Sequence, residues 1–151
     1  MKKKKRIAPE DYRKILAGLE LIDISLSRSE SFFNKDLKIT FSKLNVNISD
    51  NSNFTLSENG FVDIIQSYKL KAFDLESETI FLTVNATFNV RMKSTEPFTK
   101  DFFDIYKELT LQINTWPYFR ELVQNMTSRM NISPLTLPLF KQLPKTPSES
   151  K

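Results

Sequence analysis

The sequence predicts an α+β fold, in which a four-stranded antiparallel meander sheet carries helices packed on one face. Helical patterns occur only near the two ends of the chain, and the stretches between them alternate apolar and polar residues. The clearest of these stretches, residues 80–92, has one apolar and one polar face, which is typical of a sheet covered on one side. With 151 residues, the chain is large enough for one core. We expect a basic, disordered tail at 1–8, a single domain at 9–140 and a polar tail at 141–151.

The first predicted element is a short helix over residues 9–17. A proline and two acids at residues 9–11 suit the first turn of a helix, and Gly18 suits its end. Apolar and polar residues then alternate with a period of two, which predicts a strand over residues 19–27.

Residues 28–36 show no hydrophobic period and predict a crossover loop that contains Phe32 and Phe33. A second strand is predicted from Leu37. The apolar positions change phase at residues 42–43, which indicates a β-bulge in this strand.

Residues 50–53 and 58–60 are rich in Asn, Asp, Ser and Gly, and we expect them to bracket a loop tip. A long strand is predicted over residues 61–75. Residues 76–78 then form a tight turn before the strand over residues 80–92, in which Phe81 belongs to the more polar face.

Two helices follow, the first capped by Thr99 and carrying apolar residues at helical spacing as far as Ile113. The second is expected to be capped at residues 114–115, with Pro117 in its first turn, and to end at Pro134. An extended segment laid over apolar surface is predicted after it. The apolar residues of this segment are Leu135, Leu137 and Leu139.

The composition argues against enzymatic chemistry. The chain has no Cys and no His, which removes thiol nucleophiles, imidazole bases and the usual zinc ligands. It has only two Gly residues, too few for a phosphate-binding glycine loop. We therefore expect no catalytic residues, no cofactor and no metal, and a function that depends on binding surfaces.

The net charge of +4 comes from one end of the chain. Five of the 22 basic residues lie in residues 2–6, so the rest of the chain carries 17 basic and 18 acidic residues. This distribution disfavours a nucleic-acid interface on the domain itself. No apolar run is long enough to span a membrane, and we expect a cytoplasmic protein.

Motifs in several places resemble, in the same order, those of the SecB export-chaperone family. The strongest lies in the second predicted helix, where Pro-Tyr, Arg-Glu and Ser-Arg pairs follow one another. The matching segments are residues 23–25 (Asp-Ile-Ser), 33–36 (Phe-Asn-Lys-Asp), 78–82 (Glu-Thr-Ile-Phe-Leu), 117–118, 120–121, 128–129, and the Leu-x-Leu-Pro at 135–138.

The resemblance implies the same sheet-and-helix fold, assembled as a dimer of dimers. It also implies a holdase that binds unfolded preproteins in long apolar grooves without ATP, in protein export. Such grooves suit varied clients because apolar burial demands no fixed sequence, and Met and aromatic side chains adapt to different partners. The candidate client-binding residues are Phe32, Phe33, Leu44, Val46, Trp116, Tyr118, Phe119 and Met126. An alternative is that Phe119 and its neighbours only pack the helix on the sheet.

The resemblance also implies a docking surface for the SecA motor. The candidate partner-docking residues are Asp23, Leu75, Glu76 and Glu78. Ser27 stands where the family has a second acid in the first strand, so the sequence leaves SecA docking open. Divergent SecB-like proteins serve toxin–antitoxin modules, and an aggregation-prone antitoxin is the alternative client.

Overall fold

The computed structural model describes residues 7–37 and 44–139 and confirms the α+β class. Two helices, α2 and α3, follow the sheet in sequence, and one helix, α1, precedes it. The elements are α1 (Pro9–Ala17), β1 (Leu19–Phe33), β2 (Leu44–Leu56), the short 3-10 turn η2 (Glu58–Gly60), β3 (Phe61–Asp74), β4 (Ile80–Ser94), α2 (Lys100–Tyr106) and α3 (Thr110–Arg129).

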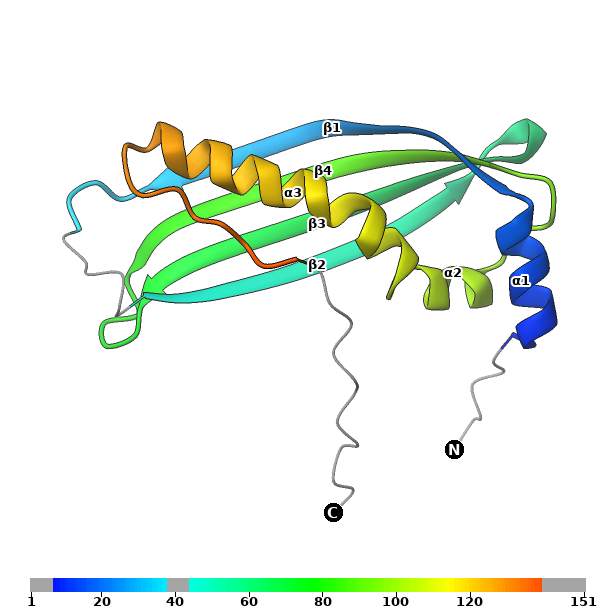
Figure 1. The fold of residues 1–151 in the computed structure, drawn as a ribbon, viewed down its shortest axis with the longest axis horizontal. Coiled ribbons are helices and arrows are strands. Elements are labelled where there is room, and N and C mark those ends of the chain that lie inside the picture. The colour runs from blue at the N-terminus through cyan, green and yellow to red at the C-terminus, as the bar shows by residue number, and fades with distance from the viewer. Residues whose placement is uncertain (1–6, 38–43, 140–151) are drawn as a thin grey trace, which may run out of the picture.

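The four strands form one antiparallel sheet in the order β1-β4-β3-β2. Strands β2, β3 and β4 are a meander, whereas β1 pairs with β4 at the opposite edge. The chain therefore crosses from one edge of the sheet to the other between β1 and β2. Figure 1 shows α3 lying across one face of this sheet, with α1 and α2 gathered at one end of it.

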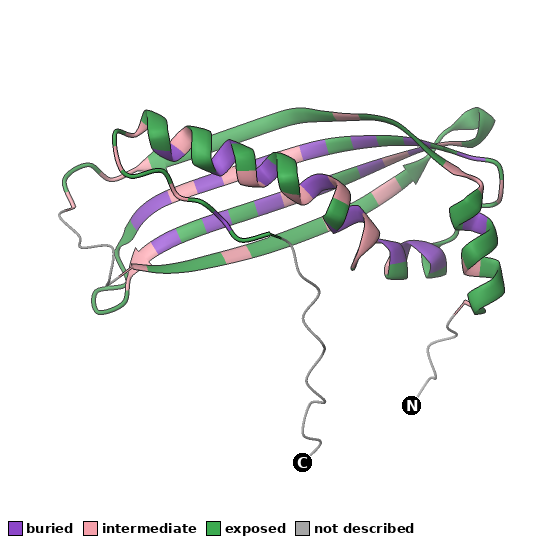
Figure 2. Ribbon diagram, viewed as in Figure 1, coloured by how far each residue is buried: buried purple, intermediate pink, exposed green. Residues whose placement is uncertain are grey.

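The core lies between the sheet and the helices. Along β3 and β4, buried side chains on the helix side alternate with more exposed ones on the other side, which we call the open face (Figure 2). This confirms the apolar and polar faces predicted for residues 80–92. The buried side chains on the helix side of these two strands are Val62, Ile64, Gln66, Tyr68, Leu70, Ala72, Leu82, Val84, Ala86, Phe88, Val90 and Met92.

Strand β1 is longer than predicted. It continues through residues 28–33, so the prediction of a loop there is wrong for Phe32 and Phe33. The pairing with β4 shifts between Leu21 and Asp23 and again at Ser27, as a β-bulge does. Each shift reverses which residues face the core, and this hides the period of two that reveals a strand.

Strand β2 also continues further than predicted. Residues 50–53 were expected at a loop tip, but they pair with β3 in an uninterrupted register that ends at Leu56. The prediction failed because Asp50 and Ser52 occupy helix-side positions that usually carry apolar residues. The turn at residues 58–60 is confirmed: Gly60 has a φ of +79°, and a Cβ there would lie 2.6 Å from the Ser94 carbonyl oxygen.

The bulge predicted at residues 42–43 lies outside the described residues. Phe81 was placed on the polar face, but it is buried. The pairing of β3 with β4 shifts between Ala72 and Phe73, and the ring of Phe81 lies edge-on to Phe33, with centroids 5.3 Å apart.

The helix boundaries differ from those predicted. Helix α2 ends at Tyr106, whereas its predicted pattern continued to Ile113. Helix α3 begins at Thr110, so Pro117 lies inside α3 and not in its first turn. The apolar spacing continues across this break, so periodicity alone could not locate it. At the other end α3 stops at Arg129, before Pro134, and Asn131 adopts a left-handed conformation with φ of 59°. Within the described residues, no helix has the length and apolar character needed to cross a membrane.

The predicted cap of α2 is confirmed, because the Phe102 backbone N–H donates to Thr99 Oγ1 at 3.2 Å. Thr99→Ala should lower the free energy of unfolding by about 1 kcal/mol, since it leaves a helix-terminal N–H without its partner. Urea denaturation measures this change. Thr99→Ser keeps a hydroxyl acceptor and should stay within about 0.5 kcal/mol of wild type; an equal loss in both variants would contradict a capping role.

Candidate functional site

Helix α3 is fixed to the sheet by an aromatic contact. Phe119 is fully buried, and its ring stacks on Tyr68 of β3 with centroids 4.8 Å apart and planes 16° apart. Leu122 and Val123 continue this buried face of the helix. Phe119 is therefore part of the core, as the alternative reading of the sequence held, and its ring is not available to a ligand on the surface.

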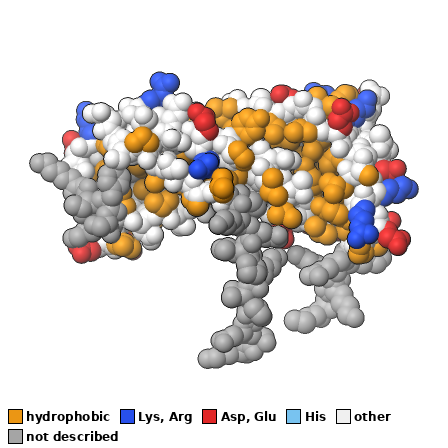
Figure 3. Space-filling view, viewed as in Figure 1, with side chains coloured by type: hydrophobic (Ala, Val, Ile, Leu, Met, Phe, Trp, Pro, Cys, Tyr) orange, Lys and Arg blue, Asp and Glu red, His pale blue; other side chains and the backbone are white. Residues whose placement is uncertain are grey.

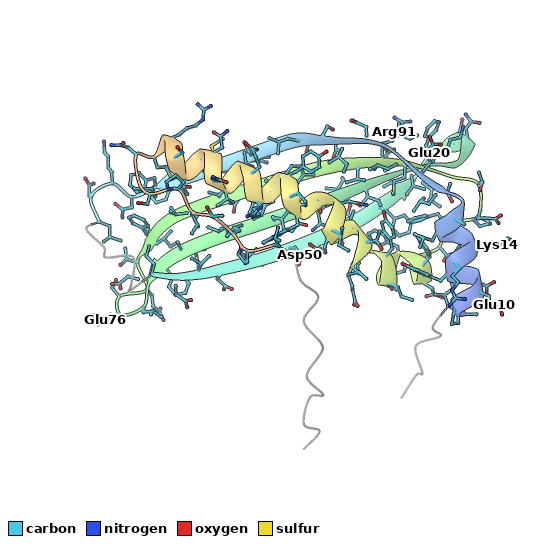
Figure 4. The ribbon with its side chains drawn as sticks, viewed as in Figure 1. Glu10, Lys14, Glu20, Asp50, Glu76 and Arg91 are labelled. Carbon is cyan, nitrogen blue, oxygen red and sulfur yellow. The ribbon has the colours of Figure 1, made fainter. Side chains whose placement is uncertain are left out.

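A polar network fixes the start of α3 to the sheet beneath it. The Tyr68 hydroxyl donates to Gln112 Oε1 at 2.7 Å and lies 2.7 Å from Thr115 Oγ1. Gln112 Nε2 and Gln66 Nε2 both donate to Asp50 Oδ2, at 2.7 and 3.3 Å. Burial is the main reason that the pKa of Tyr68 is raised to about 12. Figure 4 labels Asp50 below α3.

The chain leaves α3 in an extended stretch, residues 134–139, which we call the exit segment. It returns alongside α3, over the helix side of the sheet (Figure 1). Leu137 is only 3% exposed and belongs to the core cluster under α3. Three hydrogen bonds join side chains of α3 to the backbone of this segment: Trp116 Nε1 to the Pro138 carbonyl (2.9 Å), Arg120 Nε to the Leu137 carbonyl (2.6 Å), and the Leu135 N–H to Thr127 Oγ1 (2.8 Å).

These bonds assign roles that the sequence did not. Arg120 Nε donates to the Leu137 carbonyl, and Glu121 accepts a hydrogen bond from Asn125 Nδ2 at 3.3 Å. Trp116 and Arg120 are four residues apart and therefore share one side of the helix. That spacing, followed by a Leu-x-Leu pattern, was the only sign in the sequence of this arrangement.

Partly buried apolar side chains surround the core under α3, and we call this ring the apolar rim. Four predicted client-binding residues, Phe33, Leu44, Trp116 and Met126, belong to it although they come from three different elements. Figure 3 shows hydrophobic side chains gathered in the middle of the face that carries α3. The rim consists of Ile24, Phe33, Leu37, Leu44, Ile48, Trp116, Met126, Met130, Ile132 and Leu135.

Other predicted client-binding residues lie apart from the rim. The side chain of Phe32 points to the open face and that of Phe33 to the helix side, because consecutive strand residues point to opposite sides of a sheet. Tyr118 is 50% exposed and lies near Phe88 of β4, with ring centroids 6.2 Å apart. Val46 is on the helix side of edge strand β2 and is 40% exposed.

The predicted partner-docking residues do not form one site. Leu75, Glu76 and Glu78 lie in the turn between β3 and β4, whereas Asp23 pairs with Arg91 towards the far end of the sheet. Figure 4 shows Glu76 and Arg91 at opposite ends. Across residues 7–37 and 44–139, no group of three or more acidic side chains is arranged to hold a metal ion.

Comparisons with known proteins identify the fold. A scan against protein-family models and a search of curated proteins found no match. Among solved structures, the chain is similar to a SecB-like chaperone of Mycobacterium tuberculosis, in complex with a ChAD peptide from the HigA1 antitoxin. The identity is 17%, the TM-score is 0.76, and the match covers 89% of this chain and 99% of that one. A Streptococcus agalactiae protein of unknown function matches with a TM-score of 0.38 and 10% identity, over 80% of this chain and 97% of that one. The protein therefore has the SecB-like fold, as its sequence motifs predicted.

Proposed function

We propose that the protein is an ATP-independent holdase, which binds extended apolar segments of unfolded polypeptides on the apolar rim beside α3. The observation that carries this proposal is the exit segment. An extended piece of chain lies along α3, held through its backbone by three side chains, with one leucine in the core.

This mode of contact suits varied clients. Hydrogen bonds to a peptide backbone are indifferent to sequence, and burial of apolar surface stabilises a contact by about 25 cal/mol per Å² without fixed geometry. The rim also contains Met126 and Met130, whose flexible side chains adapt to different partners. Preproteins destined for export are the client class that we propose.

We further propose that the protein is a binding protein rather than an enzyme, acts in the cytoplasm and assembles as a homo-oligomer, with two dimers forming a tetramer. Support for assembly comes from β1, whose Leu21 and Leu26 point to the helix side of the sheet and yet are exposed. A second copy that covered these leucines would remove apolar surface from water. We also propose docking to SecA through Asp23 and the β3–β4 turn, which is supported by the sequence motifs alone.

The second candidate is a chaperone dedicated to one antitoxin. It is favoured by the similar M. tuberculosis chaperone, which was solved with a ChAD peptide of an antitoxin. Affinity purification separates the two candidates, because a single stoichiometric partner indicates a dedicated chaperone and a mixture of preproteins indicates a general one.

The rim is tested by aggregation of a reduced, unfolded client protein in the absence of ATP. The variant Leu44→Gln/Met126→Gln should need roughly tenfold more protein to halve aggregation, because it makes two rim positions polar. Tyr118→Ser removes a large side chain that lies in the same helix as Met126 but outside the rim, and this variant should hold the client as well as wild type. Equal activity of the rim variant, with unchanged assembly, would refute this site.

A further inference from the structure

The open face of the sheet is polar, and its charges are distributed unevenly. Near the α1 end, charges of opposite sign stand next to one another across the strands. Arg91 lies between Asp23 and Asp63, with its Nε 3.9 Å from Asp63 Oδ1, and Lys93 stands opposite Glu20. This half of the face therefore has no excess of cations.

The other half carries cations without acids opposite them. Lys69 and Lys71 follow one another along β3 on the open face, and both are exposed. No carboxylate occupies the positions that pair with them. The cross-strand neighbours are Asn85 and Ser49 for Lys69, and Thr83 and Asn47 for Lys71.

A hollow of about 270 Å³ lies beside Lys69. Arg28 of β1 forms part of its wall, because the bulge at Ser27 changes the phase of the strand and places Arg28 opposite Thr87 on the open face. Arg28 has one acidic neighbour, since its Nη2 lies 3.7 Å from Glu30 Oε2, and both side chains are largely exposed. An exposed pair of this kind is weak and can be exchanged for another partner.

The rest of the hollow supplies hydrogen-bonding groups. Ser67 Oγ and Thr87 Oγ1 lie 3.1 Å apart, and Asn85 also lines the hollow, together with Glu30, the acidic neighbour of Arg28. Amides and hydroxyls from neighbouring strands thus stand between two cations. Such a lining suits a carboxylate better than an apolar side chain.

We propose that this part of the open face docks an extended acidic segment of a partner protein. One carboxylate enters the hollow between Arg28 and Lys69, and a second, two residues along the segment, pairs with Lys71. The spacing fits, because residues two apart in any extended chain are separated by roughly 6.6 Å, as Lys69 and Lys71 are in β3. The surface lies on the side of the sheet opposite the apolar rim, so a client and an acidic partner can bind together.

An acidic peptide fits this surface better than a nucleic acid does. The tight binding of nucleic acids depends on contacts to many phosphates. Here three cations are partly offset by Glu30, which leaves a small local charge. Two or three carboxylates satisfy such a surface.

The probe is a short fluorescein-labelled peptide of alternating glutamate and serine, titrated with the full chain at low salt and followed by anisotropy. Lys69→Gln and Lys71→Gln should each weaken binding roughly threefold, and the double variant about tenfold. Lys93→Gln is the matched control, a lysine of the same face that stands opposite Glu20, and it should change the affinity by less than about 1.5-fold.

A peptide with glutamine in place of glutamate should not bind, and added salt should lower the affinity for the acidic peptide. Equal loss in the Lys69 and Lys93 variants, equal binding of the glutamine peptide, or tighter binding of a single-stranded oligonucleotide of the same length would overturn the proposal. Client holding should be unchanged in the lysine variants, so failure here and failure of the holdase function can be told apart.

Discussion

Phe119→Ala should lower the free energy of unfolding by about 3–5 kcal/mol, the largest effect that we expect from any single substitution in α3. Phe119 is 0% exposed and stacks on Tyr68, so its removal leaves a cavity between helix and sheet. A loss of this size is a large part of the stability of a typical domain, which is about 5–15 kcal/mol. Urea denaturation followed by circular dichroism measures it.

The neighbouring residue provides the control. Tyr118 is half exposed, and its ring centroid lies 6.2 Å from that of Phe88, so Tyr118→Ala should cost less than about 1 kcal/mol. Phe119→Leu refills most of the cavity and should recover part of the loss. If Phe119→Ala unfolded at the same urea concentration as wild type but held clients poorly, Phe119 would be a binding residue, as the sequence motifs suggested, and not a core residue.

The sequence predicted the centre of the sheet well. Strand β4 is covered on one side by α3 and open on the other, so its residues alternate cleanly along almost its whole length. The N-terminal helix was also predicted, because its proline, acids and final glycine are local features. Local pattern is sufficient where one residue and its neighbours decide the structure.

The edge strands show where local pattern fails. In β1 the bulges reverse the alternation twice, so that its second half reads as irregular. In β2 Asp50 faces the helix side because it accepts hydrogen bonds from Gln66 and Gln112, which lie 16 and 62 residues further along the chain. A single sequence does not reveal that a carboxylate on the helix side of an edge strand has such distant partners.

The candidate site was predicted only in part, because it too depends on residues that are far apart in the sequence. The resemblance to the SecB family indicated that Trp116 and Met126 line an apolar groove, and the structure places both on the rim. Phe32 and Phe33 were both assigned to the groove because the sequence predicted them in a loop, yet they lie in β1, which directs consecutive side chains to opposite faces. The bonds from Trp116 and Arg120 to the exit segment depend on how the chain returns after α3, which no local motif encodes.

Stability should also fall steeply in alkali, between about pH 10 and pH 12. Burial raises the pKa of Tyr68 and of Tyr106 from 10.0 to about 12. In the unfolded chain both phenols ionise near pH 10, so over this range the unfolded state releases protons that the folded state retains. Ionisation therefore favours unfolding, and each tyrosine should withdraw about 3 kcal/mol of stability that is fully present below pH 10.

Tyr106→Phe separates this effect from the general loss of lysine charge at high pH. The Tyr106 hydroxyl makes only long contacts, to Met92 Sδ at 3.6 Å and to Asn114 Nδ2 at 3.5 Å, so the variant should stay within about 1 kcal/mol of wild type at pH 8. It should then lose about half as much stability as wild type between pH 10 and pH 12. Urea denaturation at several pH values gives both quantities, and parallel curves for the two proteins would show that the buried phenols are not the cause. Tyr68→Phe should reduce the alkaline loss as well, but at a cost of about 1–3 kcal/mol at pH 8, because it leaves Gln112 Oε1 without its donor.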